Sequence, residues 1–214
     1  MKVLELFAGS RSFSKVAEEM GMETYTSDRE PFDNIDQVCD IFDFDLEKLE
    51  REFGKPDIVW ASPPCTFFSV SSIGHHWNKD HTPKTENAKL GMKIVAETLW
   101  IIKMLNPKYC YIENPRGKLR KLSVITNEPY FRRTVWYCQY HSKSCGIKRA
   151  KPTDIWTNDF SWIPRPECKN GNPNCDHAVA PRGSRTGKQG MKNSYEKSKV
   201  PEQLCKEILE TIIK

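Results

Sequence analysis

The 214-residue sequence has no apolar stretch that approaches the roughly 20 residues needed to cross a bilayer. Its first residues, MKVLELFAGS, lead directly into strand-like sequence and lack the apolar core of a secretory signal peptide. We therefore expect a cytoplasmic protein that does not bind a membrane. Thiols stay reduced in that compartment, so the eight cysteines predict core packing, metal binding or catalysis rather than disulfides.

Internal repeats and low-complexity linkers are also missing, and the length is typical of one domain. A complete G-x-G-x-x-G motif is lacking as well, which argues against a dinucleotide cofactor. Hydrophobic residues make up 38% and charged residues 29% of the chain, as in an ordinary globular protein.

Charge is unevenly distributed behind a net value of +5. Acidic residues are concentrated before Asp57, whereas Lys and Arg cluster at 116–122, 143–151 and 182–192. One such cluster is usually solvated surface. Three of them favour a polyanionic partner, most simply nucleic acid.

Short apolar segments alternate with helical patterns in the first half of the chain. We predict strands at 2–9, 23–28, 37–45, 56–62 and 109–115. We predict helices at 12–22, 46–54, 86–105 and 201–214. This alternation indicates βαβ units and a doubly wound, mostly parallel sheet of the α/β class.

The chain changes character after this alternation ends. Residues 155–190 are rich in Pro, Gly and Asn and predict an irregular segment. We therefore expect an α/β domain at 1–154, an irregular insertion at 155–195, and a C-terminal helix at 196–214 that packs back on the domain.

Two reactive side chains follow neighbouring predicted strands. Cys65 comes after the fourth strand in SPPC, and Glu113 comes at the end of the fifth in ENP. Ligands of open α/β sheets bind beyond the carboxyl ends of the strands, so thiol and carboxyl would share one cleft. The prolines restrict the backbone at both places. A buried cysteine at a strand end is the simple interpretation, and a rigidly held nucleophile is the sharper one.

The segments LFAGS, SPPCTFFS, YIENPRG, CGIKRAKP and KVPEQLCKEI occur in that order along almost the whole chain. In this order the segments resemble the motifs of the C5-cytosine DNA methyltransferases, most of all small phage-type members. The resemblance implies a Rossmann-like, S-adenosylmethionine-dependent methyltransferase that acts on DNA, encoded by a bacterium or phage as in restriction-modification.

The resemblance also implies roles for individual residues. Cys65 would add to C6 of a flipped cytosine, Glu113 would hydrogen-bond and protonate N3, and Asn114 would position Glu113. Arg149 and Lys151 would orient the base and its backbone. The run at 66–85 would be a mobile lid that closes over the base. The implied cofactor contacts are Phe7, Ala8 and Gly9 in the first loop, Asp28 at the ribose, Asp40 and Ile41 at the adenine, and Pro63.

Some features depart from the family pattern. The first loop, GSRSFS, lacks a second glycine, and Lys151 stands where an arginine is usual. The recognition segment at 155–195 is short, so the enzyme reads a short site, is undiscriminating, or relies on a partner.

Two alternatives stay open: a non-catalytic nucleic-acid-binding protein on this fold, and the same chemistry on RNA. We expect a monomer.

A second constellation predicts a structural zinc ion in the irregular segment. Cys168, Cys175 and His177 are the favoured ligands, and Cys145 is a candidate for the fourth. Cys138 and His141 lie a little upstream. We interpret His75, His76 and His81 as polar loop residues or DNA contacts rather than as ligands.

Overall fold

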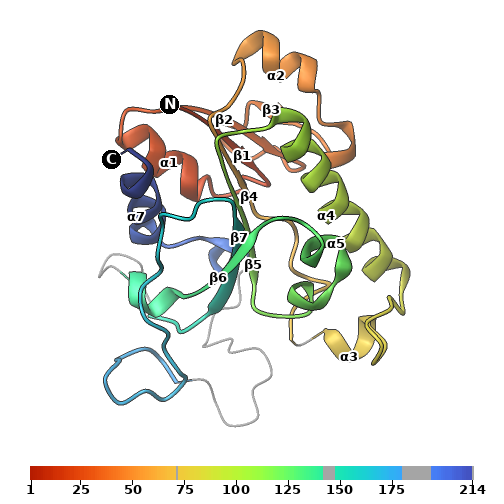
Figure 1. Ribbon diagram of the computed structural model, residues 1–214, viewed down its shortest axis with the longest axis vertical. Helices are drawn as coiled ribbons and strands as arrows, with labels where there is room; N and C mark the ends of the chain where they lie inside the picture. The colour runs from red at the N-terminus through yellow and green to blue at the C-terminus, as the bar shows by residue number, and fades with distance from the viewer. Residues whose placement is uncertain (71, 142–147, 180–193, 214) are drawn as a thin grey trace.

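The computed structural model describes residues 1–70, 72–141, 148–179 and 194–213. A seven-stranded sheet with the order β3-β2-β1-β4-β5-β7-β6 forms the middle of the molecule (Figure 1). The strands are β1 Lys2–Leu6, β2 Glu23–Asp28, β3 Gln37–Val38, β4 Ile58–Ala61, β5 Tyr109–Pro115, β6 Phe131–Trp136 and β7 Pro152–Thr157. The five strands from β3 to β5 pair in parallel, whereas β7 runs antiparallel to both β5 and β6. The predicted α/β class with a mostly parallel sheet is confirmed.

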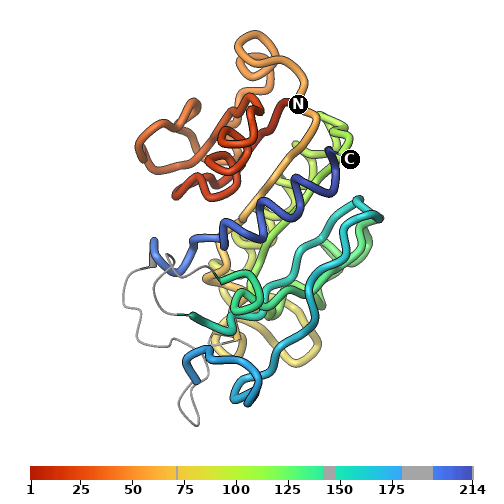
Figure 2. The backbone as a smooth tube through the Cα atoms, turned by 90° about the vertical axis from the view of Figure 1, so that its left-hand side faces the viewer, coloured from red at the N-terminus to blue at the C-terminus, as the bar shows by residue number. Residues whose placement is uncertain are grey.

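Helices cover both faces of this sheet, as the views in Figures 1 and 2 show. The α-helices are α1 Ser12–Glu19, α2 Leu46–Glu52, α3 Ile73–His76, α4 Glu86–Leu105, α5 Ser123–Thr126, α6 Ser194–Ser198 and α7 Glu202–Ile213. Three short 3-10 helices lie within the described ranges: η1 Ile41–Asp43, η2 Leu119–Lys121 and η3 Tyr137–Tyr140. No helix among the described residues is long and apolar enough to span a membrane.

Strand β4 shows how the two cores are built from one alternating sequence. Ile58 and Trp60 join the core beneath α1 and α7, whereas Val59 and Ala61 join the core beneath α4. Successive side chains of a strand point to opposite faces, so a continuous apolar run suits a strand that is covered on both sides. The result is three layers, helix, sheet and helix.

Helix α4 has the predicted bounds because polar residues mark both of its ends. The Thr85 hydroxyl accepts a hydrogen bond from the Ala88 amide at 3.2 Å at the N-terminus. Asn106 takes the left-handed conformation that commonly ends a helix, with φ 42°. The strands predicted at 23–28 and 109–115 also begin and end at the predicted residues.

Two sequence predictions about local structure are wrong. The strand predicted at 37–45 ends at Val38, because the Asp40 carboxylate accepts the Phe42 amide at 3.2 Å and starts η1. The irregular segment predicted from residue 155 begins inside β7, and β6 was not predicted at all. β7 contains Pro152 and Asp154, which strands usually avoid. Asp154 is tolerated in this strand because Arg120 donates two hydrogen bonds to its fully buried carboxylate, at 3.0 and 2.8 Å.

Beyond β7 the described residues 158–179 form no helix or strand, as predicted for most of this segment. The segment is nevertheless attached to α7. The Trp162 indole donates to Glu207 Oε1 at 3.3 Å, and Arg165 Nε donates to Glu207 Oε2 at 2.7 Å. It therefore leaves the sheet, runs along α7 and projects at the bottom of Figures 1 and 2.

Candidate active site

The first loop, between β1 and α1, is held by a carboxylate that the sequence analysis did not single out. Glu5 on β1 is 3% exposed and accepts the amide hydrogens of Phe13 at 3.3 Å and Ser14 at 2.8 Å. These two amides belong to the first turn of α1, which has no side-chain cap of its own. A single acid inside an otherwise apolar strand was the signal that could have identified Glu5.

The turn of this loop places Gly9 against the end of β2. Phe7 and Gly9 have φ values of 59° and 44°, in the left-handed region. The Asp28 carboxylate accepts the Gly9 amide at 2.9 Å through Oδ2 and the Glu30 amide at 2.9 Å through Oδ1. The predicted cofactor residues Gly9 and Asp28 therefore lie together.

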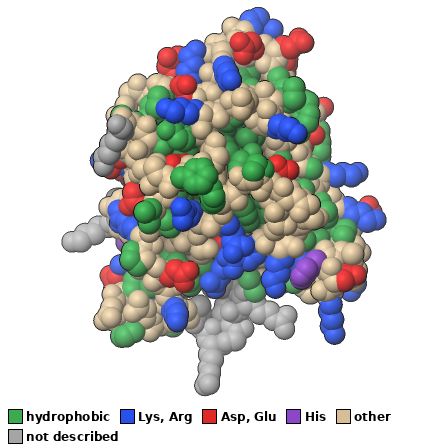
Figure 3. Space-filling model, viewed as in Figure 1, with side chains coloured by type: hydrophobic (Ala, Val, Ile, Leu, Met, Phe, Trp, Pro, Cys, Tyr) green, Lys and Arg blue, Asp and Glu red, His purple; other side chains and the backbone are tan. Residues whose placement is uncertain are grey.

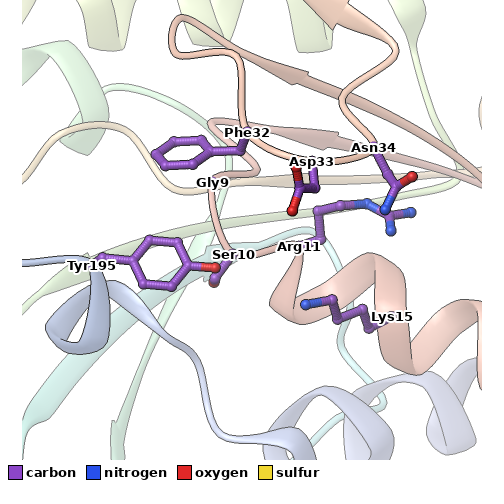
Figure 4. A pocket seen from close by; sticks show the side chains of 8 residues that line it. All are labelled: Gly9, Ser10, Arg11, Lys15, Phe32, Asp33, Asn34 and Tyr195. Carbon is purple, nitrogen blue, oxygen red and sulfur yellow. The ribbon is translucent and has the colours of Figure 1, made fainter.

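A cavity of about 220 Å³ opens beside Gly9 (Figure 4). Its walls come from the first loop, the start of α1, the connection after β2, and α6. The rings of Phe32 and Tyr195 lie 5.6 Å apart between their centroids at this cavity, and Lys15 lies on its α1 side. Phe32 and Tyr195 were not predicted, because nothing local indicates that residues 163 positions apart meet at one cavity.

The other predicted cofactor residues lie around the same sheet edge but do not line this cavity. Ala8 is buried and donates its amide to the Ser27 carbonyl at 2.9 Å. Asp40 and Ile41 form the start of η1 after β3. Pro63 follows β4 and is buried.

Cys65 follows β4 at the beginning of a tight turn. Its carbonyl accepts the amides of Phe68 and Ser69, both at 3.0 Å, and its side chain is partly exposed. The Asn114 side chain, from the neighbouring strand β5, donates to the Pro63 carbonyl at 2.9 Å. This bond ties the end of β5 to the backbone just ahead of the thiol. The side-chain carbonyl oxygen of Asn114, Oδ1, is buried and has no hydrogen-bond partner among the described residues.

Glu113, one residue before Asn114, is 5% exposed and faces a hydroxyl and a cation. Tyr137 of η3 donates its hydroxyl to Glu113 Oε1 at 3.0 Å, and Lys151 Nζ lies 4.0 Å from the same oxygen. Lys151 Nζ also donates to the Lys197 carbonyl at 2.9 Å and lies 4.4 Å from the centre of the Tyr137 ring. Tyr137 was not predicted.

The electrostatics of this group connect Cys65, Glu113 and Lys151. Burial raises the pKa of Glu113, and the Lys151 charge opposes that rise. Burial also raises the pKa of the Cys65 thiol. The Lys151 charge lowers that pKa, and the Glu113 charge raises it further. Burial lowers the pKa of Lys151, against the effect of the two acidic groups. The structure thus brings together the predicted thiol, carboxyl and lysine.

The predicted Arg149 lies two residues before Lys151 on the approach to β7. Its guanidinium donates to the Glu196 carbonyl in α6 at 3.4 Å, and burial lowers its pKa. Both basic residues therefore contact the backbone of α6, the helix that carries the cavity residue Tyr195.

The segment after Cys65, predicted as a lid, is anchored to the body of the protein at a few residues, whereas residues 78–82 are exposed. Phe68 is fully buried, and its carbonyl accepts the Lys118 amide at 2.7 Å. A Cβ atom on Gly117 would lie 2.2 Å from that carbonyl oxygen, so only glycine permits this approach. The Trp77 indole donates to the Phe67 carbonyl at 2.7 Å.

Two of the three histidines in this segment have ordinary polar partners. His76 Nδ1 lies 2.7 Å from the Thr85 hydroxyl, and His81 Nδ1 lies 2.7 Å from Lys118 Nζ. None of the three lid histidines belongs to a group of three or more metal-ligating side chains in the described part of the chain.

The predicted zinc residues do come together. Ligand atoms of Cys168, Cys175 and His177 lie within 4.8 Å of one another, and the fourth member of the group is Cys138. Cys145, the predicted candidate for that position, lies outside the described residues.

Basic side chains form a group on the surface in view. Figure 3 shows Lys and Arg spread over this face, with several of them side by side low in its centre. The predicted cluster 116–122 is described in full, and 143–151 is described only from Lys148 onward. The cluster at 182–192 lies outside the described residues.

The chain is similar to known DNA methyltransferases in sequence and in fold. Residues 1–127 match a family described as C-5 cytosine-specific DNA methylase. A probable DNA (cytosine-5)-methyltransferase of Frog virus 3 (isolate Goorha) is 30% identical over 227 aligned positions, covering 98% of this chain and 99% of the viral protein. A solved E. coli structure, described as a putative DNA modification methyltransferase encoded within a prophage, aligns with a TM-score of 0.52 at 12% identity. That alignment covers 79% of this chain and 52% of the other, and it supports the Rossmann-like methyltransferase fold.

Proposed function

Because the chain belongs to the C-5 cytosine-specific DNA methylase family, we propose that it methylates C5 of cytosine in DNA through a covalent adduct between Cys65 and cytosine C6. The methyl donor is S-adenosylmethionine. The observation that carries this proposal is the convergence of three groups: Cys65 beyond β4, Glu113 at the end of the adjacent parallel strand β5, and the buried Lys151 that interacts electrostatically with both.

The first task of this group is to make and stabilise the adduct. Cytosine C5 is a weak nucleophile until a thiolate adds at C6. The Lys151 charge favours the thiolate of Cys65, whose sulfur forms the bond to C6. Burial favours the protonated form of Glu113, whose proton passes to N3 as the sulfur lone pair forms the bond to C6 and the ring π electrons shift toward N3. Tyr137 holds the Glu113 carboxyl in place through its hydroxyl.

The later steps return both groups to their starting state. S-adenosylmethionine, when bound, supplies an electrophilic methyl group to the activated C5. The C5 proton is then lost to water, the bond between sulfur and C6 breaks, and Cys65 leaves as a thiolate. Glu113 recovers its proton from N3. The products are 5-methylcytosine, S-adenosylhomocysteine and a proton, and both Cys65 and Glu113 are regenerated.

The cavity beside Gly9 has the chemistry that an adenosyl sulfonium ligand requires. The aromatic rings of Phe32 and Tyr195 at this cavity suit a purine, and Lys15 suits a carboxylate. Asp28 does not line the cavity but accepts the Gly9 amide beside it, and its carboxylate suits ribose hydroxyls. Gly9 lines this cavity with a φ of 44°, a left-handed conformation that residues with a side chain rarely adopt.

The target base is stacked inside duplex DNA, so it must leave the stack to reach Cys65. Basic side chains on the face shown in Figure 3 suit the phosphates on either side of a flipped nucleotide. Phe68 and Trp77 are buried, so closure over the base would involve the exposed residues 78–82 of the segment after Cys65 rather than these two anchors.

Trapping on 5-fluorocytosine tests this proposal, because fluorine at C5 cannot leave as a proton does. DNA that contains 5-fluorocytosine should form a complex that survives denaturing electrophoresis and depends on S-adenosylmethionine. Cys65→Ser should abolish the covalent band, because a hydroxyl is a far poorer nucleophile than a thiolate. Cys110→Ala, which removes a buried thiol elsewhere on the sheet, should keep it.

Three outcomes separate the alternatives. A covalent band on DNA supports the proposal, and a band only on RNA of the same sequence assigns the chemistry to RNA. Cofactor binding and tight DNA binding without any band, on a library of random sequences, would instead identify a non-catalytic binding protein.

A further inference from the structure

Three thiols and one imidazole converge outside the catalytic group. Cys138 comes from η3, whereas Cys168, Cys175 and His177 come from the irregular segment after β7. Cys138, Cys168 and His177 are each at most 3% exposed, and Cys175 is partly buried. Their ligand atoms all lie within 4.8 Å of one another.

The separations suit a tetrahedral metal ion. Bonds of about 2.3 Å to sulfur and about 2.0–2.1 Å to nitrogen, at tetrahedral angles, place sulfur and nitrogen about 3.5–3.6 Å apart. Cys168 Sγ lies 3.6 Å from His177 Nδ1. All the cysteines of this group are free, so no disulfide accounts for their approach.

The local backbone turns so that the ligands face one point. The Asn172 amide donates to the Lys169 carbonyl at 3.0 Å, and the Cys175 amide donates to the Asn172 carbonyl at 3.1 Å. Gly171 has a φ of 74°, which permits the sharp reversal. The Asn172 side chain also donates to Cys168 Sγ at 3.5 Å, as suits a thiolate.

We propose that Cys138, Cys168, Cys175 and His177 bind one structural zinc ion that anchors the irregular segment 165–179 to the wall of the active site. Three thiolates and one imidazole in a closed, buried, tetrahedral set favour zinc over harder cations. The segment has no helix or strand of its own, and a metal ion is a usual means of fixing such a segment.

The position of the ligands shows what the ion would hold in place. Cys138 directly follows Tyr137, which donates to Glu113. His177 directly precedes Ala178, which pairs with Arg149 and donates its amide to the Lys148 carbonyl at 2.9 Å. The zinc ion therefore connects the backbone beside Tyr137 with the strand-like pairing beside Arg149.

Metal content tests the ligand set without reference to activity. Protein that is expressed with zinc and purified without chelators should carry close to one zinc per chain by elemental mass spectrometry. Cys138→Ala and Cys168→Ala should each lose most of that metal, whereas the matched Cys110→Ala should retain it. Cobalt substitution of the wild type should give thiolate-to-metal absorption that Cys138→Ala lacks. Metal-free wild type, a disulfide among these cysteines, or full zinc content in Cys138→Ala would overturn the site.

The anchoring role has its own test, which avoids variants that fail to fold. Chelation of the wild-type protein should speed hydrogen exchange at 137–140 and 165–179 and leave β1 and β4 protected. Added zinc should restore the slow exchange. Unchanged exchange in metal-free protein would show that the ion does not anchor the segment.

Discussion

Replacement of Lys151 by methionine tests the electrostatic core of the active site. Lys151 Nζ lies 4.0 Å from Glu113 Oε1. Two unit charges at that separation attract by about 4 kcal/mol at an effective dielectric constant of about 20. The Lys151 side chain is 18% exposed, which weakens this attraction, and its removal should raise the pKa of Glu113. The pKa of Cys65 should rise as well, because Lys151 lowers it.

The pH profile of the turnover rate reports these changes. The reaction needs Glu113 protonated and Cys65 ionised, although both pKa values are raised by burial. The profile of such a pair is bell-shaped, with an acid limb at the lower of the two coupled pKa values and an alkaline limb at the higher. Both limbs should therefore move to higher pH in Lys151→Met. Lys151→Arg keeps the charge and should leave them close to their wild-type positions.

Single-turnover rates at saturating DNA and S-adenosylmethionine, measured across pH, provide the assay. Binding of DNA by the variant should be checked separately, so that a lost contact is not mistaken for a shifted pKa. A rate that falls equally at every pH, with both limbs in place, would refute the electrostatic role and assign Lys151 to contact with the base or with α6.

Three further substitutions test the surrounding structure. Asp28→Ala should weaken S-adenosylmethionine binding by about 1–3 kcal/mol, or roughly 5- to 150-fold, and an unchanged affinity in calorimetry would contradict its assignment to the ribose. Gly117→Ala should slow methyl transfer about 10²-fold, because the new Cβ would meet a lid carbonyl at 2.2 Å, whereas Gly74→Ala, with nothing within 4 Å, should be near wild type in the same assay. Arg120→Met leaves the buried Asp154 without its cation and should cost about 3–5 kcal/mol in the free energy of unfolding. Urea unfolding measures that loss, and a value below about 1 kcal/mol would show that the pair is not needed for stability.

Much of the fold follows from local sequence. The alternation of apolar strands with amphipathic helices predicts the parallel half of the sheet, because each element must bury its apolar residues in a fixed period. Cys65 and Glu113 could be paired on this basis, since each follows or ends a strand and parallel strands end at one edge. The antiparallel hairpin of β6 and β7 was not predictable in this way, because Asp154 suits a strand only once Arg120 lies beside it.

Other features depend on which distant segments meet. Tyr137 reaches Glu113 across 24 residues, and Cys138 completes the metal group with residues at least 30 positions later in the chain. Neither residue has a distinctive local pattern. The sequence determined which chemical groups are present and which of them end strands, because local periodicity encodes both. Only the tertiary structure decided that η3 supplies both the hydroxyl at Glu113 and the third thiol of the Cys/His group, because the packing of the whole chain sets which segments lie against the end of β5.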